Sequence, residues 1–221
     1  MQDFHSLIGT QIEFEVSGRP NPVKGILVDF GSDILVIYNG QFLYLPIIHM
    51  QSMKISLNSN SEITETPEAP FENQIEKISY RKILMNAKGI FVELYVTGDQ
   101  SIHGYITSIM NDYFIFHTPV YRTLIVHLHH LKYLIPYNVN VTPYSLTQES
   151  FPFKPADMTL ARTFEQQLKK VEGKFIVLDL GRDDNRIGLL KKMENNMIEL
   201  ITANGRSVYI HLDHIKTVHQ P

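Results

Sequence analysis

The sequence predicts a mainly β protein of three tandem small five-stranded β-barrels, each preceded by a short helix. Three stretches of the 221-residue chain align with one another: residues 7–55, 87–135 and 171–218, called repeats 1, 2 and 3 below. Within each repeat apolar and polar residues alternate, which is the pattern of half-buried strands. Clusters of Gly, Asn and Asp divide the pattern into about five short runs. Such short, bent strands close best into a small barrel, which removes exposed edges.

Two glycines and a histidine mark the register of every repeat. A glycine opens each repeat, a second glycine follows 15 or 16 residues later, and a histidine follows 24 or 26 residues after that. A glycine inside a strand pattern marks a bulge or a sharp bend. The nine register residues are Gly9, Gly25 and His49, then Gly89, Gly104 and His130, then Gly173, Gly188 and His214.

Two Asn-Gly pairs give the strongest hairpin signals. Asn39-Gly40 and Asn204-Gly205 each join two apolar runs. Both central residues of a type I′ turn need positive φ, which Asn and Gly tolerate. We therefore expect two-residue hairpins at both places. Repeat 2 has HTPVYR at that point, so its hairpin is expected to be longer or differently shaped.

Helical patterns precede repeats 2 and 3, over residues 73–88 and 156–172, and Asp157 is the expected N-cap of the second. Repeat 1 has room for only a turn or two of helix. The polar, acidic segment between repeats 1 and 2 is expected to be a flexible linker, and the proline-rich segment between repeats 2 and 3 to be extended. The predicted organisation is barrel repeat 1 over 1–57, a linker over 58–72, helix plus barrel repeat 2 over 73–136, a linker over 137–155, and helix plus barrel repeat 3 over 156–221.

Composition narrows the functional classes. Hydrophobic residues make up 43% and charged residues 19%, the balance of a globular protein. A net charge of −3 lacks the basic excess of a dedicated nucleic-acid binder. The absence of cysteine excludes disulfides, thiolate catalysis and Cys-ligated zinc. The N-terminus shows no secretory signal and no apolar run approaches a membrane span, so we expect cytoplasmic synthesis and no membrane partner.

The ends of the repeats carry a family resemblance. VHLHHLKYLIP (126–136) and VYIHLDHIKTV (208–218) resemble the end of an Sm-like (SH3-like) barrel, where a 3₁₀ turn joins strands four and five. The chain is also similar to the N-terminal region of spore coat protein B and its relatives in spore-forming bacilli, whose repeats begin like DFHSLIG (3–9) and end like LDHIKTV (212–218). This similarity covers all three repeats.

Two departures from that family bear on function. Its repeats often carry a Gly-Gly-Pro-Glu-like turn, where this chain has SGRPNP, TGDQSI and GRDDNR. The founding member also has a long Ser/Lys/Arg-rich tail, whereas this sequence ends at HIKTVHQP. If the family role depends on that tail, the resemblance implies a narrower role here, as a scaffold.

Three histidines within four positions form a candidate metal site: His127, His129 and His130. Imidazole binds zinc, nickel and copper. However, His130 shares its register with His49 and His214, and His211 lies near the register of His127. We therefore interpret the cluster as structural, with the register histidine bonding backbone groups at a strand-turn-strand corner. A pH-sensitive role is the alternative for this histidine.

The sequence contains no catalytic constellation. Asp183 and Asp184 lie in the loop GRDDNR and would need a third group and a cleft for acid–base chemistry. We interpret them as part of a solvated turn. A phosphate-binding loop, a nucleophile elbow and a His-Glu-x-x-His motif are all absent. We expect no enzyme activity, no cofactor and no small-molecule substrate.

RNA binding is the alternative that an Sm-like barrel invites, because such barrels stack bases on aromatic rings and hold the backbone with Lys and Arg. The candidates are Tyr113, Phe114, Tyr121, Arg122, Lys191, Lys192 and Arg206. The acidic net charge and the lack of a repeated basic position favour ordinary packing roles instead, so nucleic acid is not the expected partner.

These observations lead to a non-enzymatic structural or protein-interaction scaffold of the bacterial spore coat. It would be made in the mother-cell cytoplasm and would bind other coat proteins or itself. Barrels of this type assemble by pairing strand edges, and neighbouring barrels of this chain are able to pair within one chain. The alternative function is an Sm-like RNA-binding protein.

Overall fold

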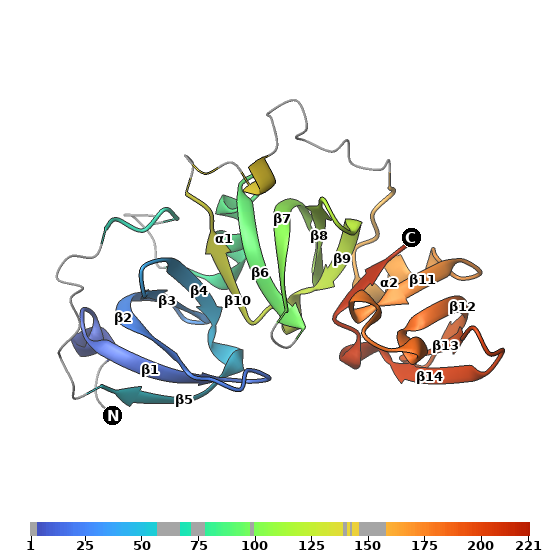
Figure 1. Cartoon of the computed structure of the whole chain (residues 1–221), viewed down its shortest axis with the longest axis horizontal. Helices are drawn as coiled ribbons and strands as arrows, with labels where there is room; N and C mark the ends of the chain where they lie inside the picture. The colour runs from blue at the N-terminus through green and yellow to red at the C-terminus, as the bar shows by residue number, and fades with distance from the viewer. Residues whose placement is uncertain are drawn as a thin grey trace. The chain divides into compact units, whose positions relative to one another are not determined.

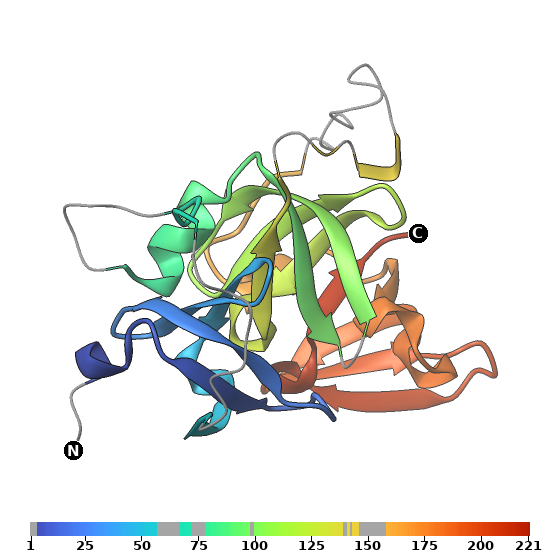
Figure 2. The same cartoon turned by 60° about the vertical axis from the view of Figure 1, so that its left-hand side comes forward.

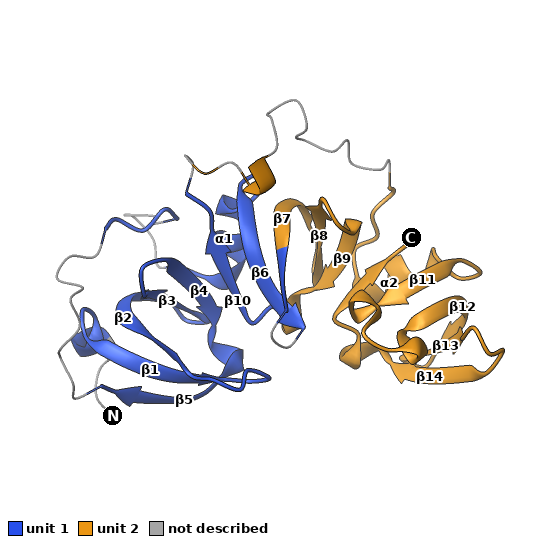
Figure 3. Cartoon of the chain, viewed as in Figure 1, with its two compact units in different colours: residues 1–102, 131–139 blue, residues 103–130, 140–221 orange. Residues whose placement is uncertain are grey.

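The computed structural model describes residues 4–56, 67–71, 78–97, 100–138, 141, 143–145 and 158–221. The fold is mainly β, and its strands pair in an antiparallel manner. Two compact units make up the chain: residues 1–102 with 131–139, and residues 103–130 with 140–221 (Figure 3). Within the described ranges, no helix is both long enough and apolar enough to cross a membrane.

Repeat 1 forms five strands in the order β5-β1-β2-β3-β4, drawn in blue to cyan in Figure 1. A short 3₁₀ helix, η1 (Phe4–Leu7), precedes them, and a 3₁₀ turn, η2 (Ile47–His49), joins the last two. The strands are β1 (Gln11–Val16), β2 (Val23–Phe30), β3 (Ile34–Tyr38), β4 (Phe42–Pro46) and β5 (Met50–Ile55). Alternate residues of β1 are buried, as the period-two pattern predicts.

Repeat 2 follows the same order of elements and contributes to both units. Helix α1 (Tyr80–Asn86) precedes the strands, and the 3₁₀ turn η3 (Leu128–His130) joins the last two. Strand β6 pairs with β10, and β8 pairs with both β7 and β9. The strands are β6 (Phe91–Thr97), β7 (Gln100–Ile109), β8 (Tyr113–Thr118), β9 (Arg122–His127) and β10 (Tyr133–Pro136).

Repeat 3 has the strand order β14-β13-β12-β11-β15, and Figure 2 shows its orange and red strands side by side. Helix α2 (Phe164–Lys169) precedes them. The strands are β11 (Phe175–Leu178), β12 (Ile187–Glu194), β13 (Met197–Ile201), β14 (Ser207–His211) and β15 (Thr217–His219). The 3₁₀ turns are η6 (Asp179–Gly181), η7 (Asp184–Arg186) and η8 (Leu212–His214).

The interior register glycine lies where the second and third strands of a repeat approach closely. A Cβ at Gly104 or Gly188 would overlap the backbone carbonyl oxygen of His117 or Ile201. A β-bulge follows each of these glycines, and the bulges lie between Leu27 and Asp29, Ile106 and Ser108, and Leu190 and Lys192. The bulge that an interior glycine predicts is therefore found in all three repeats. The opening glycines Gly9, Gly89 and Gly173 have left-handed φ values of 81°, 77° and 75°.

Both Asn-Gly pairs lie in hairpins, but the predicted type I′ turns are wrong. Residues 39–41 form a three-residue loop between the paired residues Tyr38 and Phe42. Gly40 and Gly205 have positive φ, whereas the asparagines before them do not. In repeat 3 the Thr202 N–H donates to the Arg206 carbonyl, so the loop is residues 203–205 and the left-handed Gly205 is its last residue, as in the common three-residue hairpin. The two-residue turn with two positive φ angles lies instead at Asn195 and Asn196, between β12 and β13.

The helices are shorter than the patterns predicted. Helix α2 begins at Phe164 because the Thr163 hydroxyl accepts a hydrogen bond from the Gln166 N–H at 3.3 Å, and residues 158–162 before it are not helical. Asp157, the predicted N-cap, lies outside the described residues, as does the start of the predicted helix 73–88. Helix α1 begins after Ser79, whose hydroxyl is its N-cap.

Most of both predicted linkers lies outside the described residues. The described part of the first, residues 67–71, packs on repeat 1, contrary to the expected flexible linker. Ala69 and Phe71 are buried, and the Phe71 N–H donates to the Tyr44 hydroxyl at 3.2 Å. The second contains the short 3₁₀ helix η4 (Pro143–Ser145).

The close approach at Gly188 yields a stability prediction. Replacing Gly188 with alanine forces β12 away from β13, and we expect it to lower the free energy of unfolding by ~3 kcal/mol. Gly205→Ala is the control, because a Cβ there meets nothing within 4 Å. It should lower the free energy of unfolding only by the strain of a left-handed alanine, ~1 kcal/mol. Urea unfolding measures both variants. Equal losses in the two would contradict the close-approach argument.

Candidate functional site

The closing strand of repeat 2 pairs with the fourth strand of repeat 1, within the first unit. Strands β10 and β4 lie side by side (Figure 1). Leu134 of β10 lies opposite Tyr44 of β4, and both residues are only 1% exposed. Tyr133 and Ile135, on either side of Leu134, belong to the apolar core of repeat 1. Repeat 2 therefore completes both the sheet edge and the core of its predecessor.

The closing strand of repeat 3 pairs with the fourth strand of repeat 2 in the same way, within the second unit. Val218 of β15 lies opposite Ile125 of β9, and these residues are 1% and 3% exposed. The His127 N–H donates to the Lys216 carbonyl at 3.0 Å. Tyr113 and Ile125 of repeat 2 belong to the apolar core of repeat 3. We call these two contacts the first and second junctions.

The two junctions share one register. Tyr44 and Ile125 each stand five residues before the register histidine of their repeat. Leu134 and Val218 each stand four residues after theirs. In both junctions, therefore, the same position on the fourth strand of one repeat lies opposite the same position on the fifth strand of the next.

The junctions differ at one backbone donor. Pro46 occupies in repeat 1 the position that His127 occupies in repeat 2. Proline has no N–H, so the bond from His127 to Lys216 has no counterpart at Pro46. The paired stretch is accordingly shorter at the first junction, where one residue pair is formed, than at the second, where two are formed.

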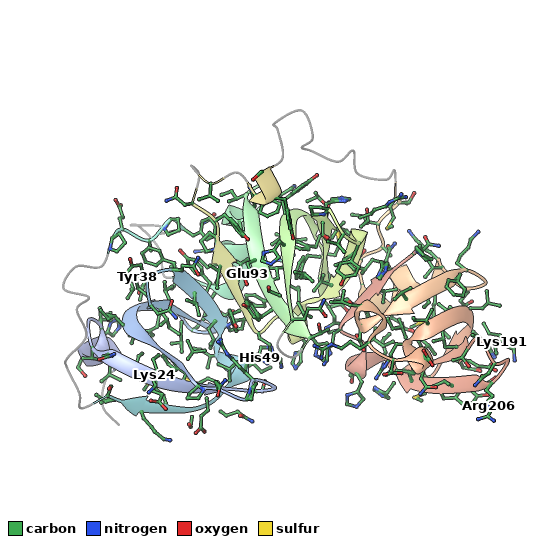
Figure 4. All side chains as sticks on the ribbon, viewed as in Figure 1. Lys24, Tyr38, His49, Glu93, Lys191 and Arg206 are labelled. Carbon is green, nitrogen blue, oxygen red and sulfur yellow. The ribbon has the colours of Figure 1, made fainter. Side chains whose placement is uncertain are left out.

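Side-chain contacts reinforce the first junction. Lys132 Nζ donates to Ser17 Oγ at 2.8 Å and to Nδ1 of the buried His49 at 3.2 Å. Figure 4 shows His49 between the end of β4 and the start of β5. Arg19 Nη1 donates to the Tyr133 hydroxyl at 2.7 Å, and its guanidinium lies 5.3 Å from the centre of the Tyr133 ring. Burial raises the pKa of Tyr133, which keeps this hydroxyl neutral.

An aspartate at an equivalent turn position binds the following helix in both junctions. Asp33 Oδ1 accepts from the Tyr80 N–H at 2.8 Å, and Asp112 Oδ1 accepts from the Phe164 N–H at 2.8 Å. Tyr80 and Phe164 are the first residues of α1 and α2. A carboxylate there satisfies an unpaired backbone donor and complements the helix dipole. Sequence reasoning singled out neither residue, although each stands eight residues after the interior glycine.

The histidine cluster has a structural arrangement. His127 Nδ1 accepts from the His129 N–H at 3.2 Å, just as His211 Nδ1 accepts from the Asp213 N–H at 3.3 Å in repeat 3. His130 Nε2 donates to the Asp213 carbonyl of the next repeat at 2.7 Å. Among the residues that the structure describes, no group of three His, Asp or Glu side chains is placed to hold a metal ion.

A hollow of about 710 Å³ lies beside the second junction, inside the second unit. Its lining includes His117, Thr123, Val218 and His219. His117 Nδ1 lies 3.1 Å from Thr123 Oγ1. The buried Nδ1 of His219 has no hydrogen-bond partner within the described part of the chain. Burial lowers the pKa of both histidines, so both rings favour the neutral form.

The candidate RNA-binding residues do not form one surface. Tyr113 and Phe114 are fully buried, and Tyr121 packs its ring against His219 at 5.4 Å. Burial raises the pKa of Tyr113 to about 12. Arg122 is exposed, at a left-handed φ of 58°.

The lysine candidates are engaged in ion pairs. Lys191 Nζ lies 2.8 Å from a Glu199 carboxylate oxygen, and Lys192 Nζ lies 2.6 Å from one of Glu194. Arg206 is exposed, and Figure 4 shows it at the outer edge of repeat 3.

The acidic pair in GRDDNR lies at the surface, as a solvated turn requires. Asp183 and Asp184 are exposed, and Asp183 Oδ1 accepts from the Asn185 N–H at 2.8 Å, which caps η7. The buried carboxylate in this region is Asp179. It accepts from the Lys216 N–H at 2.7 Å and lies 3.3 Å from Arg186, so it fixes the start of β15.

These features define a tandem-repeat β protein whose repeats are joined by strand pairing. The YwrJ third-domain family matches residues 163–218, from the N-cap of α2 to β15. The chain is 40% identical over 226 residues to "Uncharacterized protein YwrJ" of Bacillus subtilis (strain 168), and the alignment covers 100% of both chains. The chain belongs to the YwrJ family.

The contact between His130 and repeat 3 can be tested by mutation. We expect His130→Ala to lower the free energy of unfolding by ~1 kcal/mol, because the Asp213 carbonyl loses its donor. His214→Ala, at the same position of repeat 3, should lower the free energy of unfolding much less in dilute solution. Denaturant unfolding of both variants measures the difference. A loss at His214 as large as that at His130 would contradict the assigned contact.

Burial of histidines makes stability depend on pH. The pKa values of His117, His127 and His219 are lowered, mainly by burial, so the unfolded chain binds more protons than the folded chain below about pH 6.5. The free energy of unfolding should therefore be greatest above that pH and should fall as the pH drops below it. Urea midpoints at pH 7.5 and 5.5 measure this, and His219→Gln should reduce the decline. A midpoint that rises on acidification would contradict the prediction.

Proposed function

We propose that this chain is a non-enzymatic structural or protein-interaction scaffold of the bacterial spore coat. The observation that carries the proposal is the repeated junction, in which the fourth strand of one repeat pairs with the fifth strand of the next at a fixed register. Backbone pairing with a shared apolar core holds neighbouring repeats together without a ligand. A chain built in this way is suited to support other proteins.

We propose further that the three repeats are small Sm-like barrels. The strand order β5-β1-β2-β3-β4 in repeat 1 supports this assignment, and β14-β13-β12-β11-β15 is the equivalent order in repeat 3. The 3₁₀ turn between strands four and five of every repeat supports it as well. On this proposal the repeats extend over the predicted domains, 1–57, 73–136 and 156–221.

The spore-coat setting rests on the resemblance at the repeat boundaries. DFHSLIG (3–9) and LDHIKTV (212–218) are similar to the ends of the coat protein B repeats. The full-length relative from Bacillus subtilis is in keeping with an origin in bacilli. Synthesis in the mother-cell cytoplasm and binding to other coat proteins are part of the same proposal.

The Sm-like RNA-binding alternative has less support. Two of its aromatic candidates, Tyr113 and Phe114, have no exposed ring face. Its two lysine candidates lie beside glutamates that neutralise them. Labelled single-stranded RNA at low salt tests the alternative, because phosphate contacts are strongest there.

Localisation tests the scaffold proposal directly. A fluorescent fusion of the full chain, expressed from its own promoter in a sporulating Bacillus, should gather around the forespore and remain with purified spores. The free fluorescent protein, expressed in the same way, is the control and should stay in the mother cell. An abundant vegetative protein that is absent from spores would overturn the proposal.

A further inference from the structure

The junctions leave one complementary strand at each end of the repeat series. Strand β5 is the fifth strand of the first repeat, and β14 is the fourth strand of the last. Among the described residues each has one strand partner, β1 for β5 and β13 for β14. These are the two kinds of strand that the internal junctions join.

We propose that β14 of one chain pairs with β5 of a second copy of this chain, antiparallel and in the register of the two internal junctions. Tyr209 stands five residues before His214, and Met53 stands four residues after His49. The shared register therefore places Tyr209 of one chain opposite Met53 of the other. The inference deepens the proposed scaffold role and rests on it only for its biological setting.

The backbone of β14 has its outward groups in the required positions. The Thr202 N–H donates to the Arg206 carbonyl, and the Leu212 N–H donates to the Asn196 carbonyl, at 3.0 and 2.8 Å. Bonded and non-bonded residues alternate along an antiparallel strand. Residue 209 therefore directs its N–H and C=O away from β13. Ile125 has the same orientation in β9, where its neighbour His127 donates to repeat 3.

The backbone of β5 is arranged in the complementary way. The Ser56 N–H donates to the Gln11 carbonyl at 2.9 Å, so the even-numbered residues at this end of β5 bond to β1. Met53 therefore turns its N–H and C=O outward. Leu134, its equivalent, turns the same groups toward β4 and pairs with Tyr44.

Side-chain exposure also identifies these edges as unfilled junctions. Tyr209 is 64% exposed, whereas its equivalents Tyr44 and Ile125 are 1% and 3% exposed inside the junctions. Ile48, in the turn η2 before β5, is 61% exposed, and Ile55, the last residue of β5, is 46% exposed. Neither MQSMKI nor SVYIH contains a proline, a residue that protects natural strand edges from pairing, and the one lysine of β5, Lys54, forms an ion pair with Glu15 of the adjacent strand at 3.4 Å.

The register histidine of repeat 3 and a hollow beside β14 are both placed to contact a second copy of the chain paired in this way. His130 donates to a backbone carbonyl, that of Asp213, in the following repeat. The equivalent donor in repeat 3 is His214, and the equivalent acceptor on a second chain is the carbonyl of Ile48. A hollow of about 390 Å³ lies beside β14 and is lined in part by Tyr209, His211 and His214. It provides room for the incoming turn.

Cross-linking tests the register, and the chain is suited to it because it contains no cysteine. Full-length Tyr209→Cys and Met53→Cys variants, carrying tags of different size, are mixed and treated with a short bis-maleimide. We expect a cross-linked heterodimer. The matched control replaces Tyr209→Cys with Val120→Cys, at a 66% exposed apolar residue outside both edges. A yield no higher than that of the control overturns the inference.

Sedimentation velocity over a range of concentrations tests the association itself. The unmodified chain should self-associate, and Tyr209→Lys should weaken association tenfold or more, because a lysine at an edge opposes pairing. Val120→Lys adds the same charge elsewhere and should leave association unchanged. Circular dichroism confirms that both variants fold. A chain that stays monomeric, or associates equally well with Tyr209→Lys, overturns the inference.

These outcomes are separable from those of the proposed function. Localisation to spores without self-association would overturn this inference and leave the scaffold role in place. Self-association of a chain that never reaches the spore would overturn the coat setting and leave the strand pairing in place.

Discussion

Strand pairing between successive repeats is the interaction on which the rest of the structure depends. The fourth strands of repeats 1 and 2 would otherwise present a row of unpaired backbone groups. Pairing also buries Tyr44 with Leu134 and Ile125 with Val218, so one contact completes the sheet edge and the apolar core together. Burial of four such side chains favours the junctions by several kcal/mol, at ~1.5–3 kcal/mol each. The histidine and aspartate contacts can then form, because pairing fixes where the next turn and helix lie.

The two junctions reach the same arrangement by different means. The second uses the His127 N–H as an additional backbone donor, and the first lacks this donor because Pro46 stands there. Lys132, Ser17 and Arg19 add side-chain hydrogen bonds to the first junction instead. A backbone or side-chain hydrogen bond contributes a net ~0.5–1.5 kcal/mol to stability, so the side-chain bonds of the first junction offset the backbone bond that it lacks. Register therefore depends on the apolar pair that both junctions share rather than on any one polar contact.

What the sequence could predict was local. The interior glycines predicted the bulges, because a glycine repeated at the same position inside a strand pattern indicates a close approach of two backbones. The turn at Asn204 was predicted wrongly because its side chain bonds Thr202 and Arg206, a choice that dipeptide preference does not encode. Helix α2 was predicted too long because Thr163 and Asp112 fix its start. Asp112 comes from another repeat, so no pattern within the helix could show it.

The role of the histidines illustrates the same limit. The sequence favoured a structural role for the cluster but gave His127 no particular partner, and the structure shows its ring accepting from the backbone N–H of the turn that follows it, as the ring of His211 does in repeat 3. Position in the series, rather than residue type, decides exposure: Tyr44 and Tyr209 are both tyrosines at one register position, yet one is buried and the other is not. The difference is that strand β10 of repeat 2 pairs with the strand that carries Tyr44, whereas among the described residues only β13 pairs with the strand that carries Tyr209. Which side chains a repeat exposes thus depends on whether a strand of another repeat pairs with its fourth strand, a property that no single repeat contains.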